Sequence, residues 1–252
     1  MATLDQFYTK SHVSKELFDL LQTEIDICDF DVLLEPSAGR GAFFMLLDKG
    51  KREGIDLEPK CTGVKKGDFF DYSPDPSKKY LVVGNPPFGR GCSLAVKFFN
   101  KAAEFADVIA FIIPRTFKRI SIKNRLALNF ALFKSHDLPI KPCCFEPAMS
   151  AKCCFQIWRR GDIARQKIVL PKTHTDFVFL RLGPLDQRNQ PTPPQGADFA
   201  LKAYGGKCGF ITSTKLESLR PKSWHWLKSN IDADMLIERF NHLDYSVSCD
   251  TV

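Results

Sequence analysis

An apolar run that is followed closely by two consecutive prolines fixes where one buried strand of this 252-residue chain must end. Residues 81–84 (Leu-Val-Val-Gly) have the composition of a buried strand, and Asn85, Pro86, Pro87 and Phe88 follow directly. Because proline has no N–H to continue a ladder, the chain must leave the sheet here. The segment offers an amide oxygen, an unoccupied backbone carbonyl and a flat ring, which suits a planar group that carries an NH2. The alternative interpretation is a strand-ending turn with a core phenylalanine.

A glycine turn upstream indicates a nucleotide-binding unit. Residues 31–36 predict a short buried strand that contains Glu35, residues 37–41 (Ser-Ala-Gly-Arg-Gly) a tight turn, and residues 42–47 a helix. A dinucleotide fingerprint needs a third glycine where Phe44 stands, and Glu35 would repel a pyrophosphate. The turn therefore favours a ligand with an ammonium and a sulfonium, such as S-adenosylmethionine, over NAD.

Further acids follow in the order that such a site requires. Residues 54–58 predict a second strand, and Asp56 lies where a ribose-binding acid is expected. Asp68 offers a carboxylate to an adenine amino group, and Phe69 offers a ring for stacking. Each acid alone fits a solvated loop, but the ordered series that ends at Asn85 favours one site.

Taken together, these motifs resemble those of the Rossmann-type N6-adenine methyltransferases, which carry an Asn-Pro-Pro-Phe/Tyr motif. The resemblance covers about residues 1–160. Residues 5–9 (Asp-Gln-Phe-Tyr-Thr) resemble the segment that closes over the methionine end of the cofactor, and residues 35–41 resemble the cofactor loop. It implies an α/β fold with a mostly parallel sheet and an antiparallel edge strand, and S-adenosylmethionine as cofactor. The implied catalytic residues are Asn85, Pro86, Pro87 and Phe88, and the implied cofactor-binding residues are Tyr8, Thr9, Glu35, Ser37, Gly39, Gly41, Asp56, Asp68 and Phe69.

The resemblance also implies a mechanism. An exocyclic amine on a base is a poor nucleophile because its lone pair is delocalised into the ring. The Asn85 side-chain oxygen and the Pro86 carbonyl would hold its two N–H groups, and Phe88 would stack on the base. Positioning and stabilisation of the developing charge then suffice, without a metal. A base inside a duplex must first be extruded.

Charge points to a polynucleotide as the partner. Lys and Arg number 36 against 29 Asp and Glu, a formal net charge of +7, although the cofactor site itself needs acids. Arg115, Lys118 and Arg119 follow a predicted buried strand at 108–113, at the edge where ligands bind. They predict phosphate contacts beside the target base; the alternative is a solvated helix start.

We expect methyl transfer to adenine N6 in a polynucleotide, with DNA ahead of RNA. The alternatives are an RNA adenine-N6 or a protein-glutamine methyltransferase, or a catalytically silent nucleic-acid-binding subunit. The intact series Glu35, Asp56 and Asp68 argues against the silent subunit.

Beyond Arg160 the resemblance ends. Residues 183–196 predict a loop, residues 200–211 a strand–turn–strand pattern that includes Gly205 and Gly206, and the segment to Phe240 a helix. We expect residues 161–252 to form an α+β substrate-binding extension. Basic residues among Tyr204, Trp224 and Trp226 suit a nucleic-acid surface, or else these rings anchor the extension to the core.

The cysteines and the apolar runs of the sequence indicate the cellular compartment in which the protein is expected. The nine cysteines, including Cys249, are an odd number, and no secretory signal is apparent at the N-terminus, so we expect an intracellular protein, cytoplasmic or nuclear, without a disulfide framework. The adjacent pairs at 143–144 and 153–154 read as small hydrophobes on two antiparallel edge strands rather than as a zinc site. No apolar run is long enough to cross a bilayer.

Overall fold

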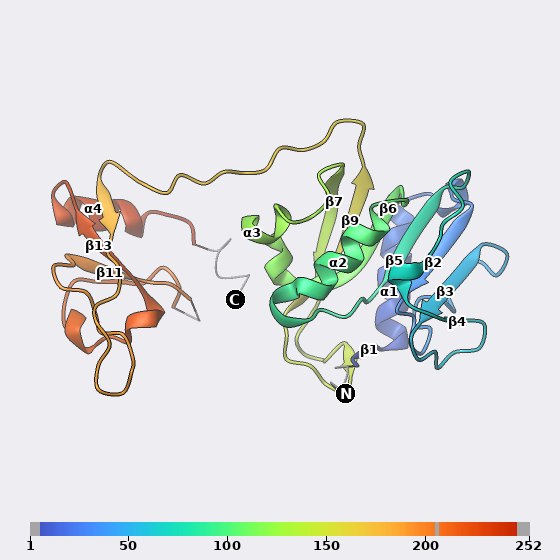
Figure 1. Ribbon diagram of the computed structural model, residues 1–252, viewed down its shortest axis with the longest axis horizontal. Helices are drawn as coiled ribbons and strands as arrows, with labels where there is room; N and C mark the ends of the chain where they lie inside the picture. Colours follow the sequence, from blue (N-terminus) through green and yellow to red (C-terminus); the bar gives the residue numbers. More distant parts are fainter. Residues whose placement is uncertain (1–5, 205–206, 246–252) are drawn as a thin grey trace. The chain divides into compact units, whose positions relative to one another are not determined.

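The chain divides into two compact units. The computed structural model describes residues 6–204 and 207–245, so Asp5, Gly205, Gly206 and Cys249 lie outside the described residues (Figure 1). The units comprise residues 1–168 and 169–252, whereas the sequence predicts a boundary at 160. Residues 161–168 belong to the first unit because Arg165 donates hydrogen bonds to the backbone carbonyls of Phe130 at 3.0 Å and Leu126 at 3.1 Å.

A seven-stranded sheet forms the frame of the first unit. Its strand order is β4-β3-β2-β5-β6-β9-β7, and only β9 runs antiparallel to its neighbours. The predicted α/β fold with a mostly parallel sheet is therefore confirmed, with the antiparallel strand one position in from the edge. The strands are β2 (Val32–Pro36), β3 (Arg52–Asp56), β4 (Lys65–Lys66), β5 (Tyr80–Gly84), β6 (Val108–Pro114), β7 (Phe130–Asp137) and β9 (Cys153–Arg160).

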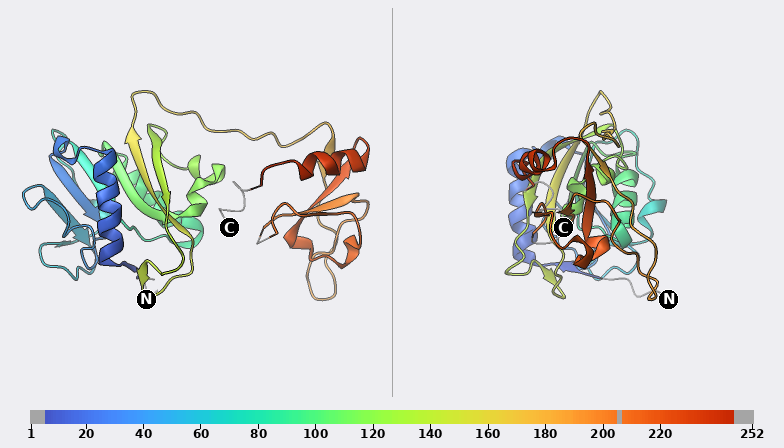
Figure 2. Two further views of the ribbon diagram at one scale, coloured as in Figure 1. Left: turned by 180° about the vertical axis from the view of Figure 1, so that it is seen from behind. Right: turned by 90° about the vertical axis from the view of Figure 1, so that its left-hand side faces the viewer.

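Helices cover both faces of this sheet, which explains why its central strands are continuous apolar runs. The helix α1 (Ser11–Glu24) packs against one face, where Leu33 and Val83 point. The helix α2 (Ser93–Ala102) packs against the other face, where Leu34 and Val82 point. Figure 1 shows α2 in front of the sheet, and Figure 2 shows α1 in front when the molecule is turned. Shorter helices are η1 (Ile27–Asp29), η2 (Phe69–Asp71), η3 (Arg90–Cys92), η4 (Arg115–Lys118) and α3 (Ile120–Lys123).

Two local predictions were wrong. Residues 42–47 form turns and not a helix, with Phe43 and Phe44 buried under the sheet edge. The segment around Cys143 does not form a strand beside β9. Instead a short strand β8 (Phe145–Glu146) pairs antiparallel with β1 (Tyr8–Thr9). The pair fastens the N-terminal segment to the loop between β7 and β9.

Strand order fixes where a ligand can bind. The chain passes from β2 outward to β3 and β4, and then returns to β5 on the other side of β2. In open α/β sheets, the crevice at such a reversal, at the carboxyl ends of the strands, holds the ligand. Glu35 lies near the end of β2, and Asn85 directly follows β5.

The second unit is an antiparallel sheet with one helix, in agreement with the expected α+β extension. The sheet order is β10-β13-β11-β12, and Phe240 of α4 packs on Phe199 and Leu227. Residues 183–196 contain only an isolated bridge, Leu185 to Pro191. The elements are β10 (Phe177–Phe179), β11 (Phe199–Lys202), β12 (Ile211–Thr212), η5 (Leu216–Ser218), η6 (Pro221–Ser223), β13 (Trp224–Ser229) and α4 (Ala233–Asn241). Across the residues that the structure describes, no helix is both long and apolar enough to cross a membrane.

Candidate active site

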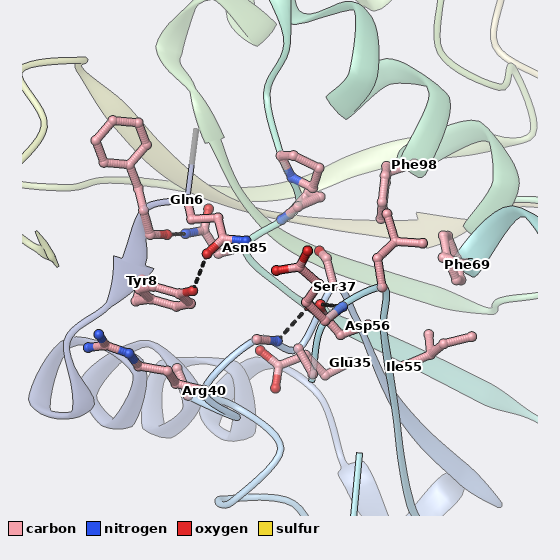
Figure 3. A pocket seen from close by; sticks show the side chains of 18 of the residues that line it. Gln6, Tyr8, Glu35, Ser37, Arg40, Ile55, Asp56, Phe69, Asn85 and Phe98 are labelled. Carbon is pink, nitrogen blue, oxygen red and sulfur yellow. Dashed lines mark hydrogen bonds between the residues drawn. The ribbon is translucent and has the colours of Figure 1, made fainter. Parts of the chain in front are cut away.

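A cavity of about 350 Å³ opens at the carboxyl edge of the sheet, where the strand order reverses. Its walls come from β1, the loop after β2, the end of β3, the segment 67–70, the segment 85–88 and α2 (Figure 3). Of the predicted catalytic and cofactor residues, all but Gly41 line it: Tyr8, Thr9, Glu35, Ser37, Gly39, Asp56, Asp68, Phe69, Asn85, Pro86, Pro87 and Phe88. Residues far apart in the sequence thus meet in one cavity.

Glu35 is the buried acid of the cavity, at 2% exposure. Its carboxylate accepts hydrogen bonds from the backbone N–H groups of Phe44 at 2.6 Å and Phe43 at 3.4 Å. Burial raises the pKa of Glu35 to about 8, the two N–H groups oppose that rise, and nearby Asp56 adds to it. The side chain therefore stabilises the segment that follows the glycine turn. A cation bound beside it would lower its pKa and favour the ionised carboxylate.

Two more acids lie along the cavity. Asp56, at the end of β3, accepts hydrogen bonds from the N–H of Gly39 at 2.8 Å and of Glu58 at 2.7 Å, one on each carboxylate oxygen. Asp68 caps η2 by accepting from the N–H of Phe70 at 2.9 Å through Oδ1. Each oxygen of Asp56 retains a second lone pair, and Oδ2 of Asp68 has no hydrogen-bond partner among the described residues. Both acids can therefore accept from a ligand's hydroxyl or amino groups.

The N-terminal segment 6–9 lies across the cavity as a strap. The Tyr8 hydroxyl donates to Gln6 Oε1 at 2.5 Å, and Lys60 Nζ donates to the Tyr8 oxygen at 2.7 Å. The Arg40 guanidinium lies 4.3 Å from the centre of the Tyr8 ring and pairs with Glu146 at 3.2 Å. These contacts, together with the β1–β8 pairing, hold the strap closed over the cavity (Figure 3).

Thr9 contributes an unsatisfied polar atom. Its Oγ1 is buried in the cavity wall and has no hydrogen-bond partner among the described residues. A buried hydroxyl without a partner carries a desolvation cost of about 1–3 kcal/mol. A ligand group in the cavity would remove that cost.

The glycine turn has the tight geometry that its sequence predicts. Gly39 has φ +51°, and a Cβ there would lie 3.0 Å from Tyr8 Cε1. The close approach of the strap to the turn therefore requires a glycine at this position. Gly41 has φ +75°, and a Cβ there would lie 2.6 Å from Cys61 Sγ. Gly41 therefore permits the turn to pack against Cys61, and it does not line the cavity. Ser37 adopts φ +53°, which is uncommon for a non-glycine residue.

A hydrogen bond fixes the orientation of the Asn85 side chain in the cavity wall. Its Nδ2 donates to the backbone carbonyl of Phe7 at 3.1 Å (Figure 3). Only the NH2 end of an amide can donate to a carbonyl, so this bond assigns the flip of the side chain. Asn85 Oδ1 and the carbonyl of Pro86 then remain without hydrogen-bond partners among the described residues. Both oxygens are therefore available as acceptors, and their predicted role toward a substrate amine stays a prediction.

The far end of the cavity is aromatic. The Phe69 ring is buried and stacks on Phe98, with centroids 5.3 Å apart and planes 24° apart. Phe70 is 37% exposed and meets Phe98 edge-on at 5.1 Å. Since Phe98 occupies one face of Phe69, the more exposed Phe70 also offers a surface for a planar ring.

The predicted phosphate-binding cluster lies outside the cavity lining. Arg115 donates to the carbonyl of Leu138 at 2.9 Å and of Cys153 at 3.3 Å, and Lys118 pairs with Asp137 at 2.8 Å. Arg119 is likewise absent from the cavity wall. Two of the three cations are therefore occupied by the β7–β9 edge, and phosphate contact by this cluster stays a prediction.

The sequence analysis missed several side chains that line or brace the cavity. Gln6 and Arg40 lie within the two motifs from which neighbouring residues were predicted as cofactor-binding. Phe98 belongs to the apolar face of α2. Ile55 precedes Asp56 on β3, where alternation places it on the other face. Lys60 had no sequence signal, because only the fold brings it to Tyr8.

The cysteines behave as packing residues. Burial raises the pKa of Cys153 and Cys154 to about 12, so both remain thiols. Among the described residues, no group of three or more His, Cys, Asp and Glu side chains is arranged to hold a metal ion.

In comparisons with known proteins, no family model matches the chain, and no curated protein matches it at a significant level. Solved structures with a similar fold include the 23S rRNA methyltransferase ErmE, with 15% identity and a TM-score of 0.43 over 60% of this chain and 69% of that chain. The N-methyltransferase NodS from Bradyrhizobium japonicum has 12% identity and a TM-score of 0.44 over 60% and 96%. The magnesium protoporphyrin IX methyltransferase ChlM from Synechocystis, solved with bound SAM, has 7% identity and a TM-score of 0.39 over 60% and 79%. At these identities the similarity concerns the fold alone.

Proposed function

We propose that this protein transfers a methyl group from S-adenosylmethionine to the exocyclic N6 amine of adenine in a polynucleotide. The observation that carries the proposal is the fixed amide of Asn85. Its Nδ2 is held by the Phe7 carbonyl at 3.1 Å, and its oxygen and the carbonyl of the next residue, Pro86, both lack hydrogen-bond partners among the described residues. Two acceptors on consecutive residues that line the cavity match the two N–H groups of an aromatic amine.

The cavity fits the cofactor as a set of donors and acceptors. Glu35 and the unsatisfied Thr9 hydroxyl would serve the charged methionine end, Asp56 the ribose hydroxyls, and Asp68 the adenine amino group. Such carboxylate contacts are charge-assisted and stronger than neutral hydrogen bonds. The cofactor supplies an activated methyl group. The chain's own residues bind it, exclude water beneath the strap and orient the amine.

The amine is activated by position. When Asn85 Oδ1 and Pro86 O accept its two N–H groups, the nitrogen becomes more pyramidal and its lone pair turns out of the ring system. Phe88 lines the cavity next to these atoms, where it can stack on the base. The positive charge that would develop on nitrogen is stabilised by acceptors already in place, and the surplus proton on that nitrogen would be lost to water. No side chain needs to act as a nucleophile.

Among polynucleotides we place DNA first, on the resemblance of the segment Gln6 to Thr9 to DNA-modifying enzymes. The excess of Lys and Arg suits either nucleic acid. RNA adenine-N6 and protein glutamine are the alternative acceptors, because both present an NH2 on a planar group.

Methyl transfer from cofactor with a labelled methyl group, to separate pools of DNA, RNA and protein, tests the proposal. We expect label in the nucleic-acid pools with the wild type and none above background with Asn85→Ala, while both bind the cofactor. Label in protein alone, or no transfer to any pool by a protein that binds the cofactor, would overturn it.

A further inference from the structure

One end of the small sheet in the second unit gathers aromatic rings around a lysine. Tyr204 is 45% exposed, Phe210 is 54% exposed, and Trp224 is half-buried. Lys202 Nζ lies 4.8 Å from the centre of the Trp224 ring and 5.8 Å from that of Tyr204. The Phe210 and Trp224 rings meet edge-on at 6.2 Å. We call Lys202, Tyr204, Phe210 and Trp224 the aromatic platform.

The platform does not belong to the core of its unit. Lys202 on β11 stands directly opposite Trp224 on β13, and both therefore project from the same face of the sheet. The neighbouring pair Phe199 and Leu227 shares its face with α4, since both pack with Phe240. Three residues separate Phe199 from Lys202, so alternation places Lys202 on the face away from α4. The same face carries Ala200 and Trp226, which are buried, so its accessible part is the end that holds Lys202 and Trp224.

Positive charge is concentrated in the segment that carries the platform. Residues 202–228 contain six Lys and Arg side chains and a single acid, Glu217. The rest of the unit, residues 169–201 and 229–252, contains four Lys and Arg side chains and eight acids. Charge within one small unit is therefore polarised, and the exposed rings coincide with the basic segment. A polyanion with flat apolar faces is complementary to both features.

We propose that the aromatic platform binds single-stranded nucleic acid by stacking bases on Trp224, Phe210 and Tyr204. This inference rests on the proposed function, since it names the form of polynucleotide that the protein holds. Base–aromatic stacking tolerates any sequence because every base has a π-face, and lysines beside the rings contact the backbone phosphates. Paired bases inside a duplex are stacked on one another and do not present these faces, so the platform selects unpaired strands.

Intrinsic fluorescence offers a direct readout of stacking. The chain has three tryptophans, and the other two, Trp158 and Trp226, are 2% exposed. A base that stacks on a tryptophan quenches its emission, so quenching reports on Trp224. The probe is fluorescein-labelled oligothymidylate, added to the full-length protein with anisotropy and tryptophan emission recorded together. Because the probe contains no adenine, its binding does not depend on methyl transfer.

We expect saturable binding with quenching by the wild type. Trp224→Ala should weaken the affinity about tenfold, the scale of losing one stacked base. Trp224→Phe should keep most of the affinity and lose the quenching. Lys202→Gln should make the dependence of log affinity on log salt shallower by about 0.7. The matched control is Phe179→Ala, because Phe179 is 56% exposed but pairs with Leu227 on the helix side of the sheet.

Four outcomes would overturn the inference: no binding by the wild type, unchanged affinity in a folded Trp224→Ala variant, quenching that persists in Trp224→Phe, or equal affinity for oligothymidylate and its duplex with oligoadenylate. The first two would leave the rings as a surface for a protein partner. Failure here is distinguishable from failure of the proposed function, because methyl transfer to free adenosine and cofactor binding do not involve the platform. Conversely, oligothymidylate binding persists even where no methyl transfer is found.

Discussion

At the scale of single residues, the proposed chemistry depends on the amide of Asn85. Its Nδ2 is held by the Phe7 carbonyl, which leaves the side-chain oxygen available as an acceptor. We expect Asn85→Ala to reduce methyl transfer a hundredfold or more, the scale of one lost transition-state contact. Cofactor affinity should change little. Turnover and calorimetry on the same preparations measure both, and near-normal turnover in a folded variant would contradict this role.

Asp56 is expected to act on binding rather than on chemistry. It stands at the end of β3 and orders the turn through Gly39 N–H. Asp56→Asn keeps one oxygen acceptor but removes the charge, so we expect S-adenosylmethionine affinity to fall by about 1.5–3 kcal/mol. The matched control is Asp19→Asn, an exposed acid paired with Lys15 on α1. Calorimetry that finds equal affinity in the Asp56 variant and the control would remove Asp56 from the cofactor site.

Glu35 predicts a pH dependence of stability. Burial raises its pKa to about 8 in the folded protein, above its ordinary value, so the folded state keeps a proton that the unfolded chain releases. The free energy of unfolding should therefore fall as pH rises from about 4.5 to about 8. Glu35→Gln cannot ionise and should lose that slope.

Urea unfolding of the wild type and Glu35→Gln at pH 5 and pH 8 measures the effect. The wild type should lose about 3 kcal/mol more than the variant between the two pH values. Parallel losses in both proteins would show that Glu35 is ionised at pH 5 and that its burial is offset by its hydrogen bonds.

At the scale of elements, the strap connects the glycine turn at 37–41 with Asn85. Its residue Phe7 holds Asn85, and Tyr8 packs on Gly39. Gly39→Ala places a Cβ 3.0 Å from the Tyr8 ring and should displace the strap, lowering cofactor affinity about tenfold or more. The matched control is Gly91→Ala, which has a similar φ of +58° but no atom within 4 Å of its Cβ. Equal effects of the two substitutions would mean that backbone strain alone is responsible.

The sequence predicts the elements whose cause is local. The proline stop after β5, the acid at the end of β3 and the apolar runs of β2 and β6 are visible as residue patterns. The pairing of β8 with β1 could not be predicted, because each strand has two residues and its partner is far away in the sequence. The turn at 42–47 was mistaken for a helix because its composition suits a helix, whereas Glu35 accepts hydrogen bonds from the backbone N–H groups of Phe43 and Phe44.

Contacts that depend on the whole fold were also beyond sequence patterns. Lys60 reaches Tyr8 only because the strap crosses the cavity. Arg115 and Lys118 look like a basic cluster in sequence, yet their partners Asp137 and Leu138 come from a different part of the chain. These partners could not be foreseen from the sequence, and phosphate contact by the cluster stays a prediction.

At the scale of the whole molecule, the two units carry different chemistry. The first holds a cavity that is lined by acids, by the strap and by Asn85. The second carries a basic segment with exposed rings, which complements a polyanion. We infer that the first unit transfers the methyl group and that the second unit binds the polynucleotide. Their separate tests, on Asn85 and Trp224, should therefore give independent losses.

The identity of the methylated atom tests the central claim most directly. Full-length protein is incubated with cofactor bearing a trideuterated methyl group and with matched single-stranded DNA and RNA oligonucleotides. The products are digested to nucleosides and analysed by mass spectrometry. The account predicts N6-methyladenine with three deuterium atoms, formed by the wild type and lost in Asn85→Ala, with DNA preferred. Label on cytosine, on guanine or on protein glutamine, with none on adenine, would contradict it.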